Sequence, residues 1–188
     1  MMSRPDCLKA LAAHRTNEIV VAFFRPAFEW TAISPSDLNY TSVLVMGQNA
    51  AHGLGLALAF PNRRVVVLDG DGCLLMSLGC LTTIANMAPR NFTHLVLNNG
   101  EYEMTGGQPL PNSSKIDFPG FARAAGYPVV REFDDLAEFA KAVPFLLTAD
   151  GPVFANLKVV KGPEPYPEDW SKMLSAERRE AFKRALLR

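Results

Sequence analysis

The sequence predicts an α/β protein with three layers, in which helices cover both faces of a mainly parallel β-sheet. Three observations lead to this prediction. Short runs of β-branched and aromatic residues alternate along the chain with longer segments of helical periodicity. The run VVVL at residues 65–68 has no polar alternation, which is typical of a strand covered on both faces. The intervening segments are long enough for right-handed crossovers, which favour parallel pairing.

The expected strands are short and rich in residues that fit a pleated, buried surface. They span residues 18–24, 41–46, 63–68, 93–97 and 153–160, with a further short strand at residues 129–130. Pro26 and Pro35 interrupt the stretch between the first two strands. We therefore expect residues 25–40 to form a connection.

The expected helices have apolar residues at intervals of three or four. They span residues 4–14, 50–60, 73–87, 118–125, 134–147 and 175–187. The second of these, AAHGLGLALAF, is small and apolar on every side, as in a helix packed on more than one face, and Pro61 ends it. Pro89 stops the third helix, and Gly126 closes the fourth.

The length of 188 residues fits one domain at residues 1–160, followed by a Pro-rich joint and a C-terminal helix at residues 161–188. Basic and acidic residues both number 19, so no net field attracts nucleic acid or anionic lipid, and any anion must be held by local geometry. Three cysteines are too few for a disulfide framework. Neither a signal-peptide core nor a membrane span is visible, so we expect a cytoplasmic protein.

Unusual residues follow three of the expected strands, at the edge where open parallel sheets bind ligands. The three strand ends are Val45-Met46-Gly47, Asp69-Gly70-Asp71-Gly72 and Asn98-Asn99-Gly100. Gly70 and Gly72 permit close backbone approach at a helix N-terminus, which suits a phosphate. Asp71 would repel that phosphate unless a hard cation such as Mg²⁺ lay between them, with Asn99 as a second oxygen ligand. Each element alone is also common as a helix cap or a turn.

Gly70-Asp71-Gly72, followed after 25 residues by Asn98-Asn99, resembles the fingerprint of thiamine-diphosphate-dependent enzymes. Three longer stretches look like the diphosphate-binding domain of the phosphonopyruvate and sulfopyruvate decarboxylases. They are residues 70–79, 98–109 and 115–126. The resemblance implies the thiamine-diphosphate-binding fold, with thiamine diphosphate and Mg²⁺ as cofactors.

The resemblance also implies roles for individual residues. Asp71, the side-chain oxygen of Asn99 and the main-chain carbonyl of Glu101 would bind Mg²⁺, and the N–H groups of Gly72 and Cys73 would hold diphosphate oxygens. The implied cofactor-binding residues are Leu44, Met46, Gly70, Asp71, Gly72, Cys73, Asn99 and Glu101.

Two of these positions depart from the family pattern, and one has a simple structural alternative. Leu44 stands where the family usually has a glycine whose carbonyl accepts from the cofactor's exocyclic amine, and Cys73 replaces a common Ser or Ala. Met46 would lie under the thiazolium ring, although an apolar residue there also suits ordinary packing at a strand end.

The catalytic glutamate of this family belongs to a separate pyrimidine-binding domain, and neither Glu18 nor Glu29 lies in a similar motif. The resemblance therefore implies a β-type subunit without a catalytic residue of its own, completed by an α-type subunit in a homo- or hetero-oligomer. The implied reaction is decarboxylation of a small anionic 2-oxo acid such as sulfopyruvate or phosphonopyruvate. His52, near the expected pyrimidine end, and Thr105 and Gln108, on a Gly-rich loop, are further candidates.

Three alternatives stay open at this point. The first is an acyloin-forming or acetolactate-synthase-like thiamine enzyme, and the second is a non-catalytic protein that keeps the fold. The third is a dinucleotide-binding module, in which Gly53 and Gly55 follow a strand and Asp69 ends the next one. Its two glycines lie inside a helical run and not at the turn between strand and helix. Leu58 stands at the third position of the motif, where Gly or Ala is needed for close packing.

Overall fold

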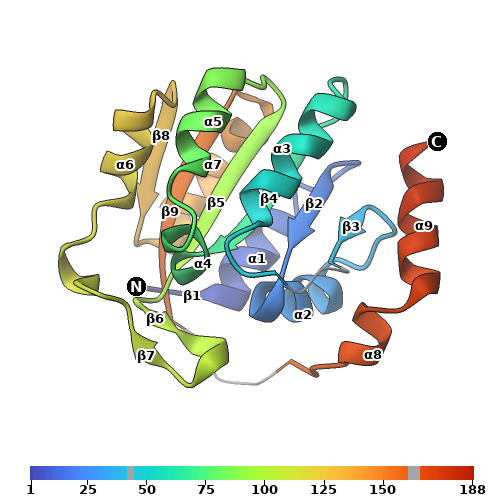
Figure 1. Cartoon of the computed structure of the whole chain (residues 1–188), viewed down its shortest axis with the longest axis horizontal. Coiled ribbons are helices and arrows are strands. Elements are labelled where there is room, and N and C mark those ends of the chain that lie inside the picture. Colours follow the sequence, from blue (N-terminus) through green and yellow to red (C-terminus); the bar gives the residue numbers. More distant parts are fainter. Residues whose placement is uncertain (42–44, 161–165) are drawn as a thin grey trace.

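A parallel sheet between two layers of helices forms the centre of the computed structural model, which describes residues 1–41, 45–160 and 166–188 (Figure 1). The described strands of this sheet are β1 (Met2–Ser3), β2 (Ile19–Ala22), β3 (Asn39–Tyr40), β4 (Val65–Gly70), β5 (Phe92–Asn98), β8 (Val129–Phe133) and β9 (Val153–Val160). Their order is β1-β9-β5-β4-β2-β3, with β8 also paired to β9. Every described strand pair in this sheet is parallel, which confirms the predicted fold class.

Helices connect these strands and cover both faces of the sheet. The described α-helices are α1 (Arg4–Ala12), α2 (Phe24–Ile33), α3 (Asn49–Ala59), α4 (Asp71–Leu75), α5 (Cys80–Met87), α6 (Phe118–Ala125), α7 (Leu136–Thr148), α8 (Trp170–Met173) and α9 (Ala176–Leu186). In the part of the chain that the structure describes, no helix has the length and apolar character needed to cross a membrane.

Two apolar cores lie on opposite faces of the sheet. Val66 and Leu68 of β4 pack with residues of α1, α2 and α7 on one face. Val65 and Val67 pack with residues of α3, α5 and α6 on the other. Because successive strand residues point to opposite faces, both sets must be apolar, and this explains why the sequence of β4 shows no polar alternation.

The expected connection at residues 25–40 was wrong in its first half, because α2 occupies Phe24–Ile33. Pro26 lies in the first turn of this helix. Proline is tolerated there, since the N–H groups of the first turn have no partner within the helix. Proline therefore marked the beginning of a helix and not its absence.

Two further expectations need correction. The single helix expected at residues 73–87 is divided into α4 and α5. The strand expected at residues 41–46 is replaced by the two-residue strand β3 at Asn39–Tyr40, while Thr41, Val45 and Met46 lie outside any strand. Residues 42–44 of that expected strand lie outside the described residues. Of the described residues of this run, Met46 lines a pocket beside the strand ends, which suits its apolar side chain.

The C-terminal segment packs back onto the domain. The Trp170 ring meets the Phe28 ring edge-on at 4.6 Å, and Phe182 is buried against Tyr40 at 5.0 Å between ring centroids. Arg178 Nε donates to Thr41 Oγ1 at 2.9 Å. The segment after residue 165 therefore supports α2 and the β3 edge, while the domain division at residue 160 stays a prediction.

Gly53 and Gly55 of α3 should respond in opposite ways to substitution by alanine. A Cβ at Gly53 would lie 2.3 Å from Val67 Cγ2, whereas a Cβ at the exposed Gly55 meets nothing within 4 Å. We expect Gly53→Ala to lower the free energy of unfolding by about 1–3 kcal/mol through overpacking. Gly55→Ala should raise it by about 0.5–1 kcal/mol through helix propensity. Urea denaturation of both variants measures these changes, and a stable Gly53→Ala protein would contradict the packing of α3 on β4.

Candidate functional site

The ends of β4 and β5 lie side by side, as the sequence predicted. Gly70 at the end of β4 is paired with Leu97 of β5. Asp71, the first residue of α4, and the turn after Asn98 therefore lie at the same edge of the sheet. A pocket opens at this edge. It is lined by seven of the eight predicted cofactor-binding residues, namely Met46, Gly70, Asp71, Gly72, Cys73, Asn99 and Glu101. Leu44, the eighth, lies outside the described residues.

Asp71 holds the two strand ends together. Its Oδ1 accepts from the N–H of Gly72 at 2.8 Å, and its Oδ2 accepts from the N–H of Gly100 at 2.6 Å. The side chain is buried, and in the described part of the chain no ion pair joins it to a basic residue. Burial raises the pKa of Asp71 to about 6, against the opposing effect of the backbone N–H groups of Gly100, Gly72 and Asn99.

The side-chain oxygen of Asn99 binds the same turn. Its Oδ1 accepts from the N–H of Glu101 at 3.1 Å, next along the chain to the N–H of Gly100 that Asp71 binds. Gly100 has a φ of +79°, a backbone conformation that favours glycine. Two side-chain oxygens thus accept from consecutive N–H groups of one turn, which places Asp71 and Asn99 at the same turn.

The oxygen set at this turn differs from a carboxylate-rich metal site. Within the described ranges, no group of three His, Cys, Asp or Glu side chains is placed to hold a metal ion. A site with one carboxylate, one amide oxygen and one main-chain carbonyl suits Mg²⁺ when phosphate oxygens complete the coordination. The metal-ligand roles of Asp71, Asn99 and Glu101 stay predictions.

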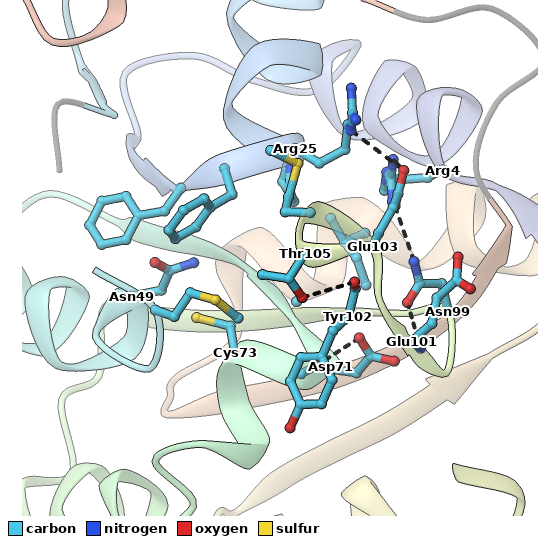
Figure 2. A pocket seen from close by; sticks show the side chains of 18 residues that line it. Arg4, Arg25, Asn49, Asp71, Cys73, Asn99, Glu101, Tyr102, Glu103 and Thr105 are labelled. Carbon is cyan, nitrogen blue, oxygen red and sulfur yellow. Dashed lines mark hydrogen bonds and ion pairs between the residues drawn. The ribbon is translucent and has the colours of Figure 1, made fainter. Parts of the chain in front are cut away.

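Tyr102 lies directly against the start of α4. A Cβ at Gly72 would come within 2.6 Å of Tyr102 Cδ1, so this ring can approach the backbone only because residue 72 is a glycine. Figure 2 shows Tyr102 beside Asp71 and Cys73 at one side of the pocket. Gly72, which the sequence predicted to allow a phosphate to approach the backbone, therefore also makes room for the Tyr102 ring.

Cys73 links α4 to the loop before α3, and Met46 belongs to that loop. Cys73 Sγ accepts from the N–H of Gly47 at 3.0 Å. Burial raises the pKa of the Cys73 thiol far above its ordinary value, so the thiol stays neutral. Met46 is half-buried at the pocket wall, as expected for either of its two interpretations.

Four pocket residues with charged or amide side chains were not predicted. Asn49 is buried with its Nδ2 donating to Leu68 O, while its Oδ1 has no hydrogen-bond partner among the described residues. Arg4, Arg25 and Glu103 also line the pocket. The only sequence signal for Asn49 is a polar residue at the start of an otherwise apolar helix.

A chain of ion pairs crosses the pocket. Arg4 is buried and donates to Glu29 from Nε and Nη2, both at 2.7 Å, and to Glu103 Oε2 from Nη1 at 2.6 Å. Arg25 Nε lies 3.4 Å from Glu103 Oε1, and Arg25 also pairs with Glu168. Burial by itself would lower the pKa of Arg4, but its hydrogen bonds to Glu29 and Glu103 raise it, so Arg4 stays charged.

The three further candidates have different surroundings. His52 contacts Phe23 and Tyr40, with ring centroids 5.5 and 5.7 Å away, and its Nδ1 lies 2.9 Å from Gln48 O, outside the lining of this pocket. Thr105 lines the pocket. Gln108 donates to Thr105 O at 2.9 Å and fastens the small antiparallel hairpin of β6 (Glu101–Tyr102) and β7 (Gln108–Pro109). The two residues therefore act together in the shape of this loop.

The dinucleotide-binding alternative finds no support in this geometry. Gly53 and Gly55 both lie within α3 and not at the turn that precedes it. Gly53 faces the sheet beside Val67, and Gly55 faces open space. Neither glycine therefore lies where a diphosphate could reach the start of α3.

Comparison with known proteins agrees with the site. Residues 27–157 match the family described as thiamine pyrophosphate enzyme, C-terminal TPP binding domain. A phosphonopyruvate decarboxylase of Streptomyces viridochromogenes is 42% identical over 134 residues, covering 71% of this chain and 33% of the relative. The sulfopyruvate decarboxylase subunit beta of Methanothermobacter thermautotrophicus is 37% identical over 168 residues, covering 89% of this chain and 87% of the relative.

A solved structure of another decarboxylase has the same fold. The benzoylformate decarboxylase structure from Polynucleobacter necessarius superimposes with a TM-score of 0.68 at 24% identity, over 88% of this chain and 34% of that one. The chain thus spans about one third of the phosphonopyruvate decarboxylase and nearly the full length of the archaeal subunit. The matched residues include the Asp71 turn and every described residue that was predicted to bind the cofactor. The chain belongs to the thiamine pyrophosphate enzymes and contains their C-terminal TPP-binding domain.

Proposed function

We propose that this chain is the β-type subunit of a thiamine-diphosphate- and Mg²⁺-dependent 2-oxo acid decarboxylase. The observation that carries the proposal is the arrangement around Asp71. A buried carboxylate that has no basic partner among the described residues and the amide oxygen of Asn99 accept from consecutive N–H groups of one turn, beside the N-terminus of α4. An ionised group in such a place needs a cation, and a diphosphate beside it would share that cation.

The residues of this edge fit the proposed cofactor. Asp71, Asn99 and the carbonyl of Glu101 would hold Mg²⁺, and the backbone from Gly70 to Cys73 would bind the diphosphate. When bound, thiamine diphosphate supplies an electron sink for the electron pair left by departing CO₂. Tyr102 covers the start of α4 and keeps water from one side of it, and Met46 offers an apolar surface in the same pocket.

The proposed substrate is a small 2-oxo acid with a second anionic group. The names of the relatives support this class, since phosphonopyruvate and sulfopyruvate both belong to it. Arg25 supplies a positive charge at the pocket, where its side chain is 22% exposed and therefore reachable from solvent. An arginine is well suited to recognise a phosphonate or sulfonate group.

The proposed partner is a pyrimidine-binding subunit that supplies the catalytic glutamate. The relative of similar length is named a beta subunit, whereas the matching region makes up only 33% of the phosphonopyruvate decarboxylase. Glu29, one of the two glutamates considered above, is paired with the buried Arg4 and so has a structural use within this chain.

Asp71→Ala should abolish Mg²⁺-dependent binding of thiamine diphosphate. The affinity should fall by at least about 100-fold, because even the loss of a residue that only orients a ligand reduces metal affinity 10- to 100-fold. Calorimetric titration with and without Mg²⁺ measures the effect, and Asp37→Ala, at an exposed position, is the matched control. Undiminished binding by a folded Asp71→Ala protein would remove the metal assignment.

The contribution of Asp71 to the stability of the metal-free protein should fall as pH rises from about 4 to 7. The raised pKa of Asp71, about 6 against an ordinary 3.8, means that the folded chain binds this proton more tightly than the unfolded chain. Stability from this group is therefore present at low pH and is lost as pH rises through about 6, by roughly 3 kcal/mol at most.

Urea denaturation in EDTA at pH 5 to 7.5 tests this pH dependence. Asp71→Asn removes the titration, so the difference in unfolding free energy between variant and wild type should change with pH in the expected direction. Parallel profiles for the two proteins would show that Asp71 does not carry the effect.

The purified chain alone should not decarboxylate sulfopyruvate or phosphonopyruvate, and it should gain activity when its partner is added. Co-purification from native cells identifies the partner, and an assay of CO₂ release compares the chain, the partner and their mixture. Turnover by the chain alone would contradict the division of the active site between two subunits.

A further inference from the structure

The side-chain amide of Asn99 can serve a cation from only one of its two ends. Its oxygen is an acceptor, whereas its nitrogen carries two hydrogens and has no lone pair to offer. The two ends have nearly the same shape, so neighbouring groups decide which end faces the Asp71 turn. Any residue that fixes this orientation controls whether the site can bind Mg²⁺.

Glu103 fixes the amide from the nitrogen side. Asn99 Nδ2 donates to Glu103 Oε2 at 3.1 Å, while Asn99 Oδ1 accepts from the N–H of Glu101 at 3.1 Å. A carboxylate can only accept, so the nitrogen must face Glu103 and the oxygen must face the turn. Figure 2 shows this series of contacts from Arg25 through Glu103 and Asn99 to Glu101.

Two arginines hold Glu103 in its acceptor role. Arg4 donates to its two oxygens at 2.6 and 3.3 Å, and Arg25 Nε lies at 3.4 Å. Arg4 is itself held by both oxygens of Glu29. The Glu103 carboxylate therefore stays ionised and directed at Asn99.

We propose that Glu103 is a positioning residue that presents the oxygen of Asn99 to the metal, and that Arg4 and Arg25 hold Glu103 for this purpose. The inference rests on the proposed metal site at Asp71 and Asn99. The inference adds Glu103 as a residue that controls the affinity for the metal and the cofactor through Asn99 and not by contacting either of them.

Glu103→Leu tests the proposal because it removes both acceptor oxygens and keeps a side chain of similar size. Asn99 Nδ2 and Arg4 Nη1 donate to the same oxygen, Glu103 Oε2, so this variant takes the acceptor away from the Asn99 nitrogen. The Asn99 amide is then free to turn and offer its nitrogen to the metal. We expect the affinity for Mn²⁺, used as the probe in the presence of saturating thiamine diphosphate, to fall 10- to 100-fold by electron paramagnetic resonance titration.

Asn99→Asp in the Glu103→Leu background should restore Mn²⁺ binding to within about fivefold of wild type. An aspartate has oxygens at both ends, so either orientation presents an oxygen to the metal. A residue that merely stabilised the loop would not be rescued by a second change at Asn99. Failure of the rescue in a folded double variant would therefore overturn the positioning role.

Glu29→Gln is the matched control for damage to the ion-pair chain. It weakens the support of Arg4 and leaves the carboxylate of Glu103 in place, so Mn²⁺ affinity should stay within about threefold of wild type. An equal loss in Glu29→Gln and Glu103→Leu would mean that general loosening is the cause. If Glu103→Leu does not fold, Glu103→Asp keeps the charge and shortens the reach to Asn99, and undiminished Mn²⁺ affinity there would also overturn the inference.

The same titrations separate this inference from the proposed function. If wild type and Asp71→Ala bind Mn²⁺ equally, or if neither binds it, the metal site itself is refuted. If Asp71→Ala loses Mn²⁺ while Glu103→Leu keeps wild-type affinity, the metal site stands and the role of Glu103 is refuted.

Discussion

The site depends on one buried carboxylate that joins two strand ends. Asp71 at the start of α4 accepts from its neighbour Gly72 and from Gly100 in the turn after β5. These two hydrogen bonds fix the relative position of the helix N-terminus and the turn that carries Asn99. The same carboxylate is buried without a basic partner in the described chain, and burial raises its pKa. A group placed in this way holds the structure together and attracts a cation at the same time.

The topology of the sheet makes this contact possible. In register, Gly70 pairs with Leu97, so residues 71 and 98–99 leave neighbouring parallel strands at the same edge. Gly72 then admits the ring of Tyr102, which a Cβ would displace. The turn, the helix and the aromatic cover are consequently close-packed, and a change in any one of them moves the others.

Local features of the sequence predicted the residues at the centre of this site. They did not predict the pairings between residues far apart in the chain. Asp71, Gly72 and Asn99 could be found because strand ends and turn residues are visible in short windows, and parallel strands bring those ends together. The pairing of Arg4 with Glu29 and Glu103 spans 25 and 99 positions, and nothing in a short window signals such partners.

The missed secondary structure has equally specific causes. Pro26 was taken as a break although it lies in the first turn of α2, where proline is tolerated. The run at residues 41–46 has the composition of a strand, but its described residues form none, and the short strand β3 precedes it. At Pro26 the local signal was misread, whereas at residues 41–46 the tertiary context overrode the strand composition.

The pocket also joins segments from outside the matched family region. Residues 27–157 match the family and contain Asp71, Asn99 and Glu103, whereas Arg4 and Arg25 precede this region and Glu168 follows it. Arg25 links Glu103 to Glu168, and Trp170 packs on Phe28 just behind that contact. The N-terminal helix α1 and the segment after residue 165 therefore both contact α2. The charged residues around this wall come from inside and outside the matched region, whereas the described residues proposed to hold the cofactor all lie inside it.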